Sequence, residues 1–206
     1  MQVLSTKTLT NEELIPPGLV GLFGPPGSIK SSIAATWPKP MAYYDFDRGL
    51  HRARGVKLTV TDTGTTAEYF GVPDLIIPRY PTVPAKSMTT RFEKLDGWRE
   101  AWSNFVKQFV RDCENKAIRT IVWDTATVEW ALCTDCFLEE LQQRTAPDGS
   151  IRKQLQQLDY GEPNKRQNAM LSAAQSYRKN LLLVHHETDE YAPLTIAGHV
   201  VTDDNG

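Results

Sequence analysis

Residues 24–31, which read GPPGSIKS, constrain the fold of this chain more than any other feature. They follow a short apolar run at 19–23, which predicts a buried strand, and they precede a segment of helical composition at 31–37. This order is typical of a phosphate-binding loop: a strand, a Gly/Pro turn, Lys-Ser and then a helix. In such a loop, successive backbone N–H groups point at an anion. The alternative is a Gly/Pro turn that happens to precede Lys-Ser.

The residue types in this loop predict a site for nucleotide phosphates and Mg²⁺. Lys30 would reach the β- and γ-phosphates, and the Ser31 hydroxyl would ligate the metal. Ile29 stands where G-x-x-x-x-G-K-[ST] has its second glycine. A β-branched residue disfavours positive φ, so we expect Ile29 to take a negative φ or to carry strain. The predicted ATP contacts come from Gly24, Pro25, Pro26, Gly27, Ser28, Ile29, Lys30, Ser31 and Ser32.

A second acidic position completes the predicted metal site. The apolar run at 120–123 predicts a strand that ends at Asp124, about ninety residues after the loop. In a phosphate-loop site a carboxylate at such a strand end holds the water shell of the metal. We therefore interpret Ser31 and Asp124 as the metal-binding pair, although strands also end in Asp at simple turns.

Hydrolysis needs a further base, because Thr125 and not Glu follows Asp124. The best candidate is Asp47, just beyond a predicted strand at 41–44, at the edge of an open α/β sheet where ligands bind. The alternative is that Asp45 and Asp47 only cap the next helix. His186 ends another strand at 181–184 and is positioned to donate a hydrogen bond to the γ-phosphate. A zinc interpretation of the histidine pair lacks accompanying ligands at zinc spacing.

The remaining pattern predicts an α/β fold with a mostly parallel sheet between helical layers. Short apolar runs without in/out alternation are typical of strands that are covered on both faces. Between them, aromatic and apolar residues recur at helical spacing over 98–113, which predicts a helix that packs on the sheet. Further helices are expected at 128–143 and 167–179, strands at 56–60 and 75–77, and a proline-rich loop at 78–84. We expect Cys133 and Cys136 to be packed inside a helix.

Composition narrows the class of protein. The chain has 206 residues, 40% of them hydrophobic, which predicts one folded domain over 1–206. Three cysteines do not form an even disulfide framework, which favours a reducing compartment, the cytoplasm. The N-terminus lacks the features of a secretory signal, and no apolar run approaches the roughly 18 residues that span a bilayer. We therefore expect no membrane association.

Together, GLFGPPGSIKSS, YYDFDRGLHRA, TIVWDTATVEW, LDYGEPNKRQ and LLLVHHETDEY resemble the RecA-like P-loop ATPases of bacteriophages, nucleotide-binding proteins of the AAA type. Some of these act in recombination with single-strand annealing. The resemblance implies a three-layer RecA-like core, with one strand between the loop strand and the Asp124 strand. It implies ATP and Mg²⁺ as ligands, Asp47 as the catalytic acid and His186 as the γ-phosphate sensor. Such proteins usually carry further sheet strands where this sequence stops, so a truncated or minimal version is a further expectation. Ile29 in place of glycine and the shorter Asp47 in place of Glu imply slow hydrolysis.

Uneven charge raises the question of a nucleic-acid partner. Residues 142–180 carry a local net charge of +4, and Tyr160 and Tyr177 lie within this stretch. It would hold single-stranded DNA through phosphate contacts and stacking, or it is a solvated helix face. Three functions stay open: an ATPase on single-stranded DNA in phage recombination or replication, a non-hydrolysing nucleotide-binding scaffold, and a small-molecule nucleotide kinase. A homo-oligomer, either a ring or a filament, is a further expectation.

Overall fold

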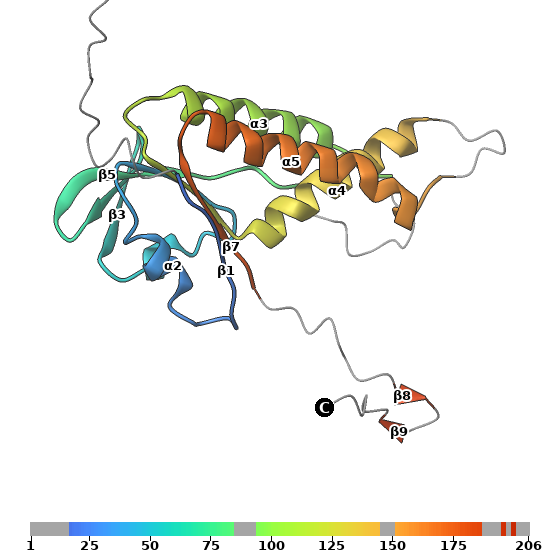
Figure 1. Ribbon diagram of the computed structural model, residues 1–206, viewed down its shortest axis with the longest axis horizontal. Helices are drawn as coiled ribbons and strands as arrows, with labels where there is room; N and C mark the ends of the chain where they lie inside the picture. Colours follow the sequence, from blue (N-terminus) through green and yellow to red (C-terminus); the bar gives the residue numbers. More distant parts are fainter. Residues whose placement is uncertain (1–16, 85–93, 145–150, 187–194, 197–198, 201–206) are drawn as a thin grey trace, which may run out of the picture.

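The computed structural model describes residues 17–84, 94–144, 151–186, 195–196 and 199–200. Strands and helices alternate along the chain as expected for an α/β protein (Figure 1). The strands are β1 (Leu19–Leu22), β2 (Met41–Asp45), β3 (Val56–Thr61), β4 (Gly64–Tyr69), β5 (Val72–Arg79), β6 (Thr120–Asp124), β7 (Asn180–Val184), β8 (Thr195–Ile196) and β9 (His199–Val200). The helices are α2 (Lys30–Ala34), η1 (Leu50–Arg52), α3 (Trp98–Glu114), α4 (Ala126–Gln143), η2 (Gln157–Tyr160) and α5 (Gly161–Ser176).

A seven-stranded sheet organises the described part of the chain, in the order β1-β7-β6-β2-β5-β4-β3. The first five of these strands are parallel neighbours, whereas β4 and β3 add an antiparallel extension. β7 lies between the loop strand β1 and the Asp124 strand β6, which is the arrangement implied by the resemblance. The predicted mostly parallel α/β sheet is confirmed, and it is consistent with a P-loop NTPase core.

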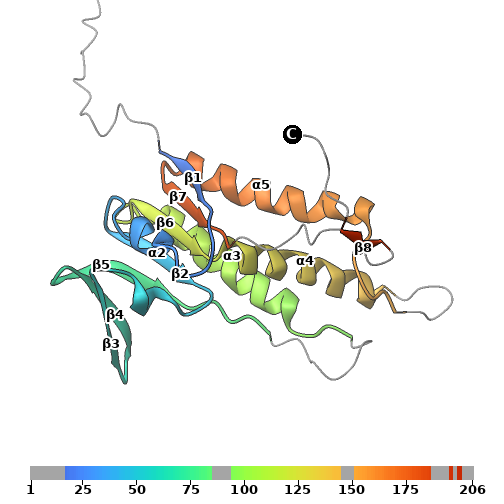
Figure 2. The same ribbon diagram turned by 90° about the horizontal axis from the view of Figure 1, so that it is seen from below.

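The two faces of the sheet are covered unequally. The long helices α3, α4 and α5 lie together on one face, and the short α2 lies on the other (Figures 1 and 2). The predicted aromatic face of α3 is confirmed, because its rings pack on Trp123 of β6, with Phe105 and Phe109 at 5.8 and 5.4 Å between ring centroids. Cys133 and Cys136 are buried in α4, as expected from their helical spacing.

Several elements differ from the sequence prediction. α2 has five residues and not seven, because the chain turns at Thr36 and Trp37 before Pro38. β5 runs through Pro78 to Arg79, so the proline-rich loop begins later than expected. The strand β4 was not predicted, since its polar sequence, GTTAEY, shows no apolar alternation.

The last helix also differs, since α5 begins at Gly161 and ends at Ser176, whereas 167–179 was expected. It ends there because Arg178 adopts a left-handed φ of 56°. The N–H groups of Arg178 and Lys179 then bond back to the carbonyls of Gln175 and Ala174, which closes the helix. Among the described helices, none is both long and apolar enough to cross a membrane.

Candidate functional site

The carboxyl ends of four neighbouring strands lie level with one another. Strand register pairs Leu22 of β1 with Val184 of β7, Val184 with Asp124 of β6, and Asp124 with Asp45 of β2. The segments that follow these strands therefore meet at one edge of the sheet, where ligands of open α/β folds bind. The four segments carry the phosphate-binding loop, His186, Asp124 and Asp47, which are the candidate residues from the sequence.

The loop backbone has the shape that its glycines allow. Gly24 and Gly27 have φ values of +153° and +78°, which side-chain-bearing residues rarely adopt. A Cβ on Gly24 would also lie 3.2 Å from the Ser28 hydroxyl. Ile29 has φ −72° and a side chain that is 69% exposed, so the position is accommodated without positive φ. The first of the two outcomes expected for Ile29 is thus observed.

Lys30 places its charge inside this loop. Its side-chain nitrogen donates to the carbonyls of Gly24 and Pro25 at 2.7 and 2.8 Å, and to the Ser28 hydroxyl at 2.8 Å. The residue is buried although it is a lysine. The ammonium therefore lies among oxygen acceptors of the loop, the kind of partner that phosphate oxygens also provide.

Ser31 and Asp124, the predicted metal pair, are in direct contact. The Ser31 hydroxyl donates to Asp124 Oδ2 at 2.6 Å, and the Tyr43 hydroxyl donates to the same oxygen at 2.5 Å. Burial raises the pKa of the Asp124 carboxyl, and the two hydroxyl donors counteract that rise. Burial, with the Asp124 charge, raises the pKa of Tyr43 well above its usual value, so the phenol stays a donor.

Asp45 and Asp47 differ in their contacts. Asp45 accepts hydrogen bonds from the N–H groups of Gly49 and Leu50 at 2.7 and 3.1 Å, which caps the start of η1. Burial raises the pKa of Asp45 to about 6. Asp47 Oδ1 accepts from Gly49 N at 2.9 Å, and the other carboxylate oxygen lies 3.8 Å from the Arg52 guanidinium. Its side chain is 29% exposed, so Asp47 reaches the site surface.

His186 lies beside Asp47 although the two residues are far apart in sequence. Its Nε2 lies 3.7 Å from Asp47 Oδ2. Its Nδ1 is buried and has no hydrogen-bond partner among the described residues. The preceding His185 stacks on Phe23, with ring centroids 4.5 Å apart, and this contact holds the ends of β1 and β7 together.

These residues fit a magnesium nucleotide. Mg²⁺ prefers oxygen ligands, and it commonly takes one or two protein groups together with phosphates and water. Ser31 and Asp124 offer such a pair, Lys30 offers the charge for the phosphates, and the glycines let the backbone approach them closely. Asp47 and His186 stand across from the loop, where a carboxylate and an imidazole are able to contact a terminal phosphate or the water that attacks it.

Two residues that were predicted to contact ATP, Pro26 and Ser32, make no side-chain hydrogen bond with the other site residues in the described part of the chain. Two residues that were not predicted, Tyr43 and Arg52, do contact them. The Ser32 hydroxyl accepts from Arg54 N at 2.8 Å, away from the loop, and no contact of the described residues assigns Pro26 a role. The sequence analysis missed Tyr43, which lies inside a continuously buried strand with no motif to mark it, and Arg52, which follows the DFDRG turn.

The basic stretch at 142–180 does not form one continuous cationic face. Arg166 is paired with Glu140 at 2.8 Å and Glu162 at 3.3 Å, and Arg152 is paired with Asp159. Tyr160 stacks on Trp130. The end of the stretch, from Tyr177 to Asn180, lines a pocket. Residues 145–150 lie outside the described part of the chain.

Comparison with known proteins agrees with this geometry. No curated protein matches the chain at a significant level. The sequence model of one family, described as an AAA domain, matches residues 19–201 and so covers every candidate residue of the site. With its loop, acidic strand end and mostly parallel sheet in the order described above, the chain belongs to the AAA-domain family of nucleotide-binding P-loop ATPases.

Proposed function

We propose that this protein is a magnesium-dependent ATPase that acts on single-stranded DNA. The observation that carries the proposal is the convergence of four groups at one sheet edge: the loop with Lys30, the Ser31–Asp124 pair, Asp47 and His186. A glycine loop with positive φ lies beside two buried carboxylates, Asp45 and Asp124. Structural ion pairs do not require such a loop, whereas a nucleotide site uses the loop for phosphates and a carboxylate for the metal.

Each group has a role that follows from its position. Lys30 stabilises negative charge on the phosphates, and Ser31 with Asp124 holds Mg²⁺. The metal neutralises phosphate charge and orients the phosphates. Asp47 orients or deprotonates the attacking water, and His186 contacts the terminal phosphate through a ring nitrogen. Because His186 also lies 3.7 Å from Asp47, a change at the phosphate is passed to the carboxylate that positions the water.

The partners belong to the same proposal. We propose single-stranded DNA as the polymer partner, in phage recombination or replication, on the strength of the sequence resemblance. We also propose self-association into a ring or filament. Exposed apolar side chains beside the nucleotide loop support an interface there: Phe23 is 70% exposed, Ile29 69% and Ile33 40%.

Steady-state hydrolysis of Mg-ATP, with and without single-stranded DNA, tests the function directly. We expect turnover that requires Mg²⁺ and rises when the DNA is added. Lys30→Ala removes the charge inside the loop and should abolish this turnover. The matched control is Lys57→Ala, since Lys57 is an exposed lysine of β3 that pairs with Glu68.

Other outcomes select the competing functions. Tight Mg-ATP binding without turnover, with or without DNA, favours the non-hydrolysing scaffold and contradicts the proposed ATPase. Phosphate transfer to a nucleoside monophosphate, followed by chromatography of the products, favours the kinase. The absence of Mg-ATP binding by calorimetry rejects all three.

A further inference from the structure

A second concave site lies at the opposite edge of the sheet. A pocket of about 610 Å³ opens where the chain enters β1, β6 and β7 and where it approaches β2. The strands between this edge and the nucleotide site are about five residues long, a separation of roughly 16 Å. We call it the amino-edge pocket, and its lining residues are Pro17, Gly18, Trp37, Pro38, Lys116, Ile118, Arg119, Tyr177, Arg178, Lys179 and Asn180.

Positive charge lines this pocket. Among the described residues, its lining includes four cationic side chains and no carboxylate. Lys116, Arg119 and Arg178 belong to exposed residues. Lys179 is buried, because its ammonium donates to the carbonyls of Asn115 and Ile118 at 2.7 Å each. Three of the four cations therefore belong to exposed residues, and backbone carbonyls hold the fourth.

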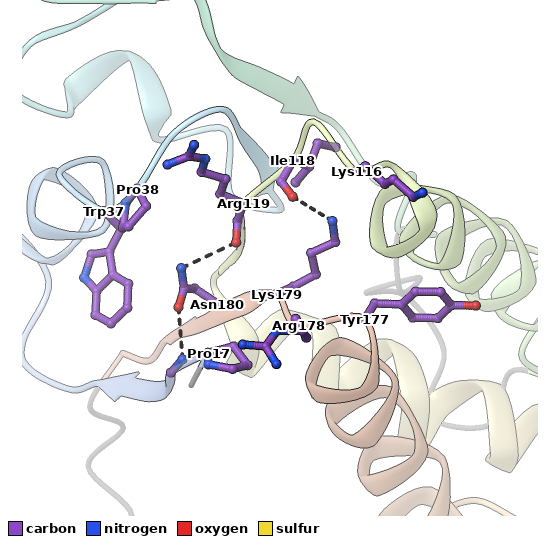
Figure 3. A pocket seen from close by; sticks show the side chains of 11 residues that line it. Pro17, Trp37, Pro38, Lys116, Ile118, Arg119, Tyr177, Arg178, Lys179 and Asn180 are labelled. Atoms are coloured by element: carbon purple, nitrogen blue, oxygen red, sulfur yellow. Dashed lines mark hydrogen bonds between the residues drawn. The ribbon is translucent and has the colours of Figure 1, made fainter. Parts of the chain in front are cut away.

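Aromatic rings lie at both ends of the cationic group. Figure 3 shows Trp37 on one side of the pocket and Tyr177 with Lys116 on the other, with Arg119 and Arg178 between them. Trp37 packs on the backbone of Gly18, where a Cβ would meet its ring at 3.4 Å, and Tyr177 is 46% exposed. Cations between planar rings suit a ligand that alternates phosphates with flat bases.

The framework of the pocket is rigid. Asn180 accepts from Gly18 N at 3.0 Å through its side chain, and its own N–H donates to Arg119 O at 3.0 Å. These bonds join the starts of β1, β7 and β6. The backbone from which the lining side chains project is therefore held in place by the sheet.

The backbone of Arg178 is a second, independent observation. Arg178 occupies the left-handed position after α5, with φ 56°, where glycine is the favoured residue. A residue with a Cβ is disfavoured there by roughly 1–2 kcal/mol. Strain of this kind accumulates at functional positions. The cation therefore stands at a position of the pocket wall where glycine would be the more stable residue.

We propose that the amino-edge pocket binds single-stranded nucleic acid, with its phosphates against Lys116, Arg119 and Arg178 and its bases against Trp37 or Tyr177. The proposal rests on the proposed action on single-stranded DNA and adds the place of contact. The strand then lies on the sheet edge away from the nucleotide, so binding and basal hydrolysis are separable by mutation.

Arg178→Gly is the sharpest test. It removes a cation and also the left-handed strain, so we expect an unchanged or higher melting temperature together with at least tenfold weaker binding of a fluorescent oligothymidylate, measured by anisotropy. The double variant Lys116→Glu/Arg119→Glu should weaken binding further. It should also reduce the slope of log affinity against log salt by about 1.4, for two lost phosphate contacts.

The control variant is Lys165→Glu, which lies in the same basic stretch but near the start of α5. It is twelve residues from Tyr177, about 18 Å along a helix, and exposed. It should bind the oligonucleotide as the parent does. Tyr177→Phe should retain binding and Tyr177→Ala should reduce it, because only the first keeps the ring.

The outcomes separate this proposal from the proposed function. If the parent binds oligothymidylate and Arg178→Gly and the double variant bind equally well, the strand lies elsewhere and the pocket assignment is wrong. If the parent hydrolyses Mg-ATP but binds no oligonucleotide, the pocket proposal and the DNA partner both fail while the ATPase stands. Displacement by thymidine monophosphate at equal nucleotide concentration would identify a mononucleotide site and overturn the assignment of a strand.

Discussion

At the scale of single residues, Asp47 is the carboxylate that we propose to act in ATP hydrolysis. Asp45 already caps η1 through two backbone N–H groups, whereas Asp47 makes one such contact and lies beside His186. We expect Asp47→Asn to lower turnover by roughly two or more orders of magnitude, the range of a general base, with nucleotide affinity nearly intact. Asp47→Glu should keep or raise the rate, because the longer chain reaches further toward the water.

Turnover and melting temperature, measured for both Asp47 variants, distinguish catalysis from capping. A capping role would make Asn a good replacement and Glu a poor one, with a change of about 1 kcal/mol in stability and none in rate. The control is Asp62→Asn, an exposed aspartate between β3 and β4. Parental hydrolysis by Asp47→Asn would leave Asp47 as a cap alone.

Tyr43 carries a second prediction at the residue scale. Tyr43→Phe removes one of two hydroxyl donors to Asp124 Oδ2, which leaves the buried carboxylate less stabilised and its pKa higher. We expect a higher Mg²⁺ concentration at half-maximal turnover. The neighbouring Tyr44→Phe is the control, because Tyr44 donates at 2.6 Å to Asp112 on the helical side. It should lower stability and leave the Mg²⁺ titration unchanged.

At the scale of elements, a buried carboxyl makes the packing of α4 on α5 depend on pH. Glu129 of α4 is fully buried, and the side-chain amide of Gln167 of α5 donates to it at 3.0 Å. Burial raises the pKa of Glu129 from its ordinary 4.5 to about 8. The folded state therefore binds a proton that the unfolded chain releases. The contribution of this proton to the free energy of unfolding is complete below pH 4.5 and is lost as pH rises through about 8.

Glu129→Gln removes this dependence, since the amide is neutral at every pH. We expect the variant to melt at nearly the parental temperature at pH 5, and several degrees above the parent at pH 8.5. Thermal unfolding at both pH values measures the difference. Glu100→Gln, at an exposed position of α3, should show no such pH-dependent gain. Equal melting of Glu129→Gln and the parent at pH 8.5 would contradict a buried, protonated Glu129.

At the scale of the whole molecule, the nucleotide site joins β1, β6, β7 and β2, so its ligand should stabilise the entire sheet. A ligand at one hundred times its Kd adds about 2.7 kcal/mol to stability. For a domain of this size that corresponds to a melting temperature roughly 5–10 °C higher. We expect Mg-ATP to produce this shift in the parent and none in Lys30→Ala. An equal shift in Lys30→Ala would place nucleotide binding outside the loop.

Much of the nucleotide site was readable in the linear order of residues. The loop at 24–31, Asp124 at a strand end and the helical face over 98–113 are local patterns, and backbone geometry restricts each to few structures. A glycine turn between strand and helix, or an apolar residue every third or fourth position, is informative before any tertiary contact forms. These elements, the α/β class and the negative φ of Ile29 agree with the structure.

What only the tertiary structure decided is which distant groups share a surface. Tyr43 reaches Asp124 because β2 pairs with β6, and Asp47 meets His186 because β7 and β2 flank that strand, pairings between residues far apart in the chain. The same packing divided the basic stretch, pairing Arg166 with Glu140 and placing Arg178 with Arg119 and Trp37 at the amino-edge pocket. Local sequence patterns specify single helices and strands. Burial and strand order depend on all of these elements at once, so the residues that share a surface could be identified only from the tertiary structure.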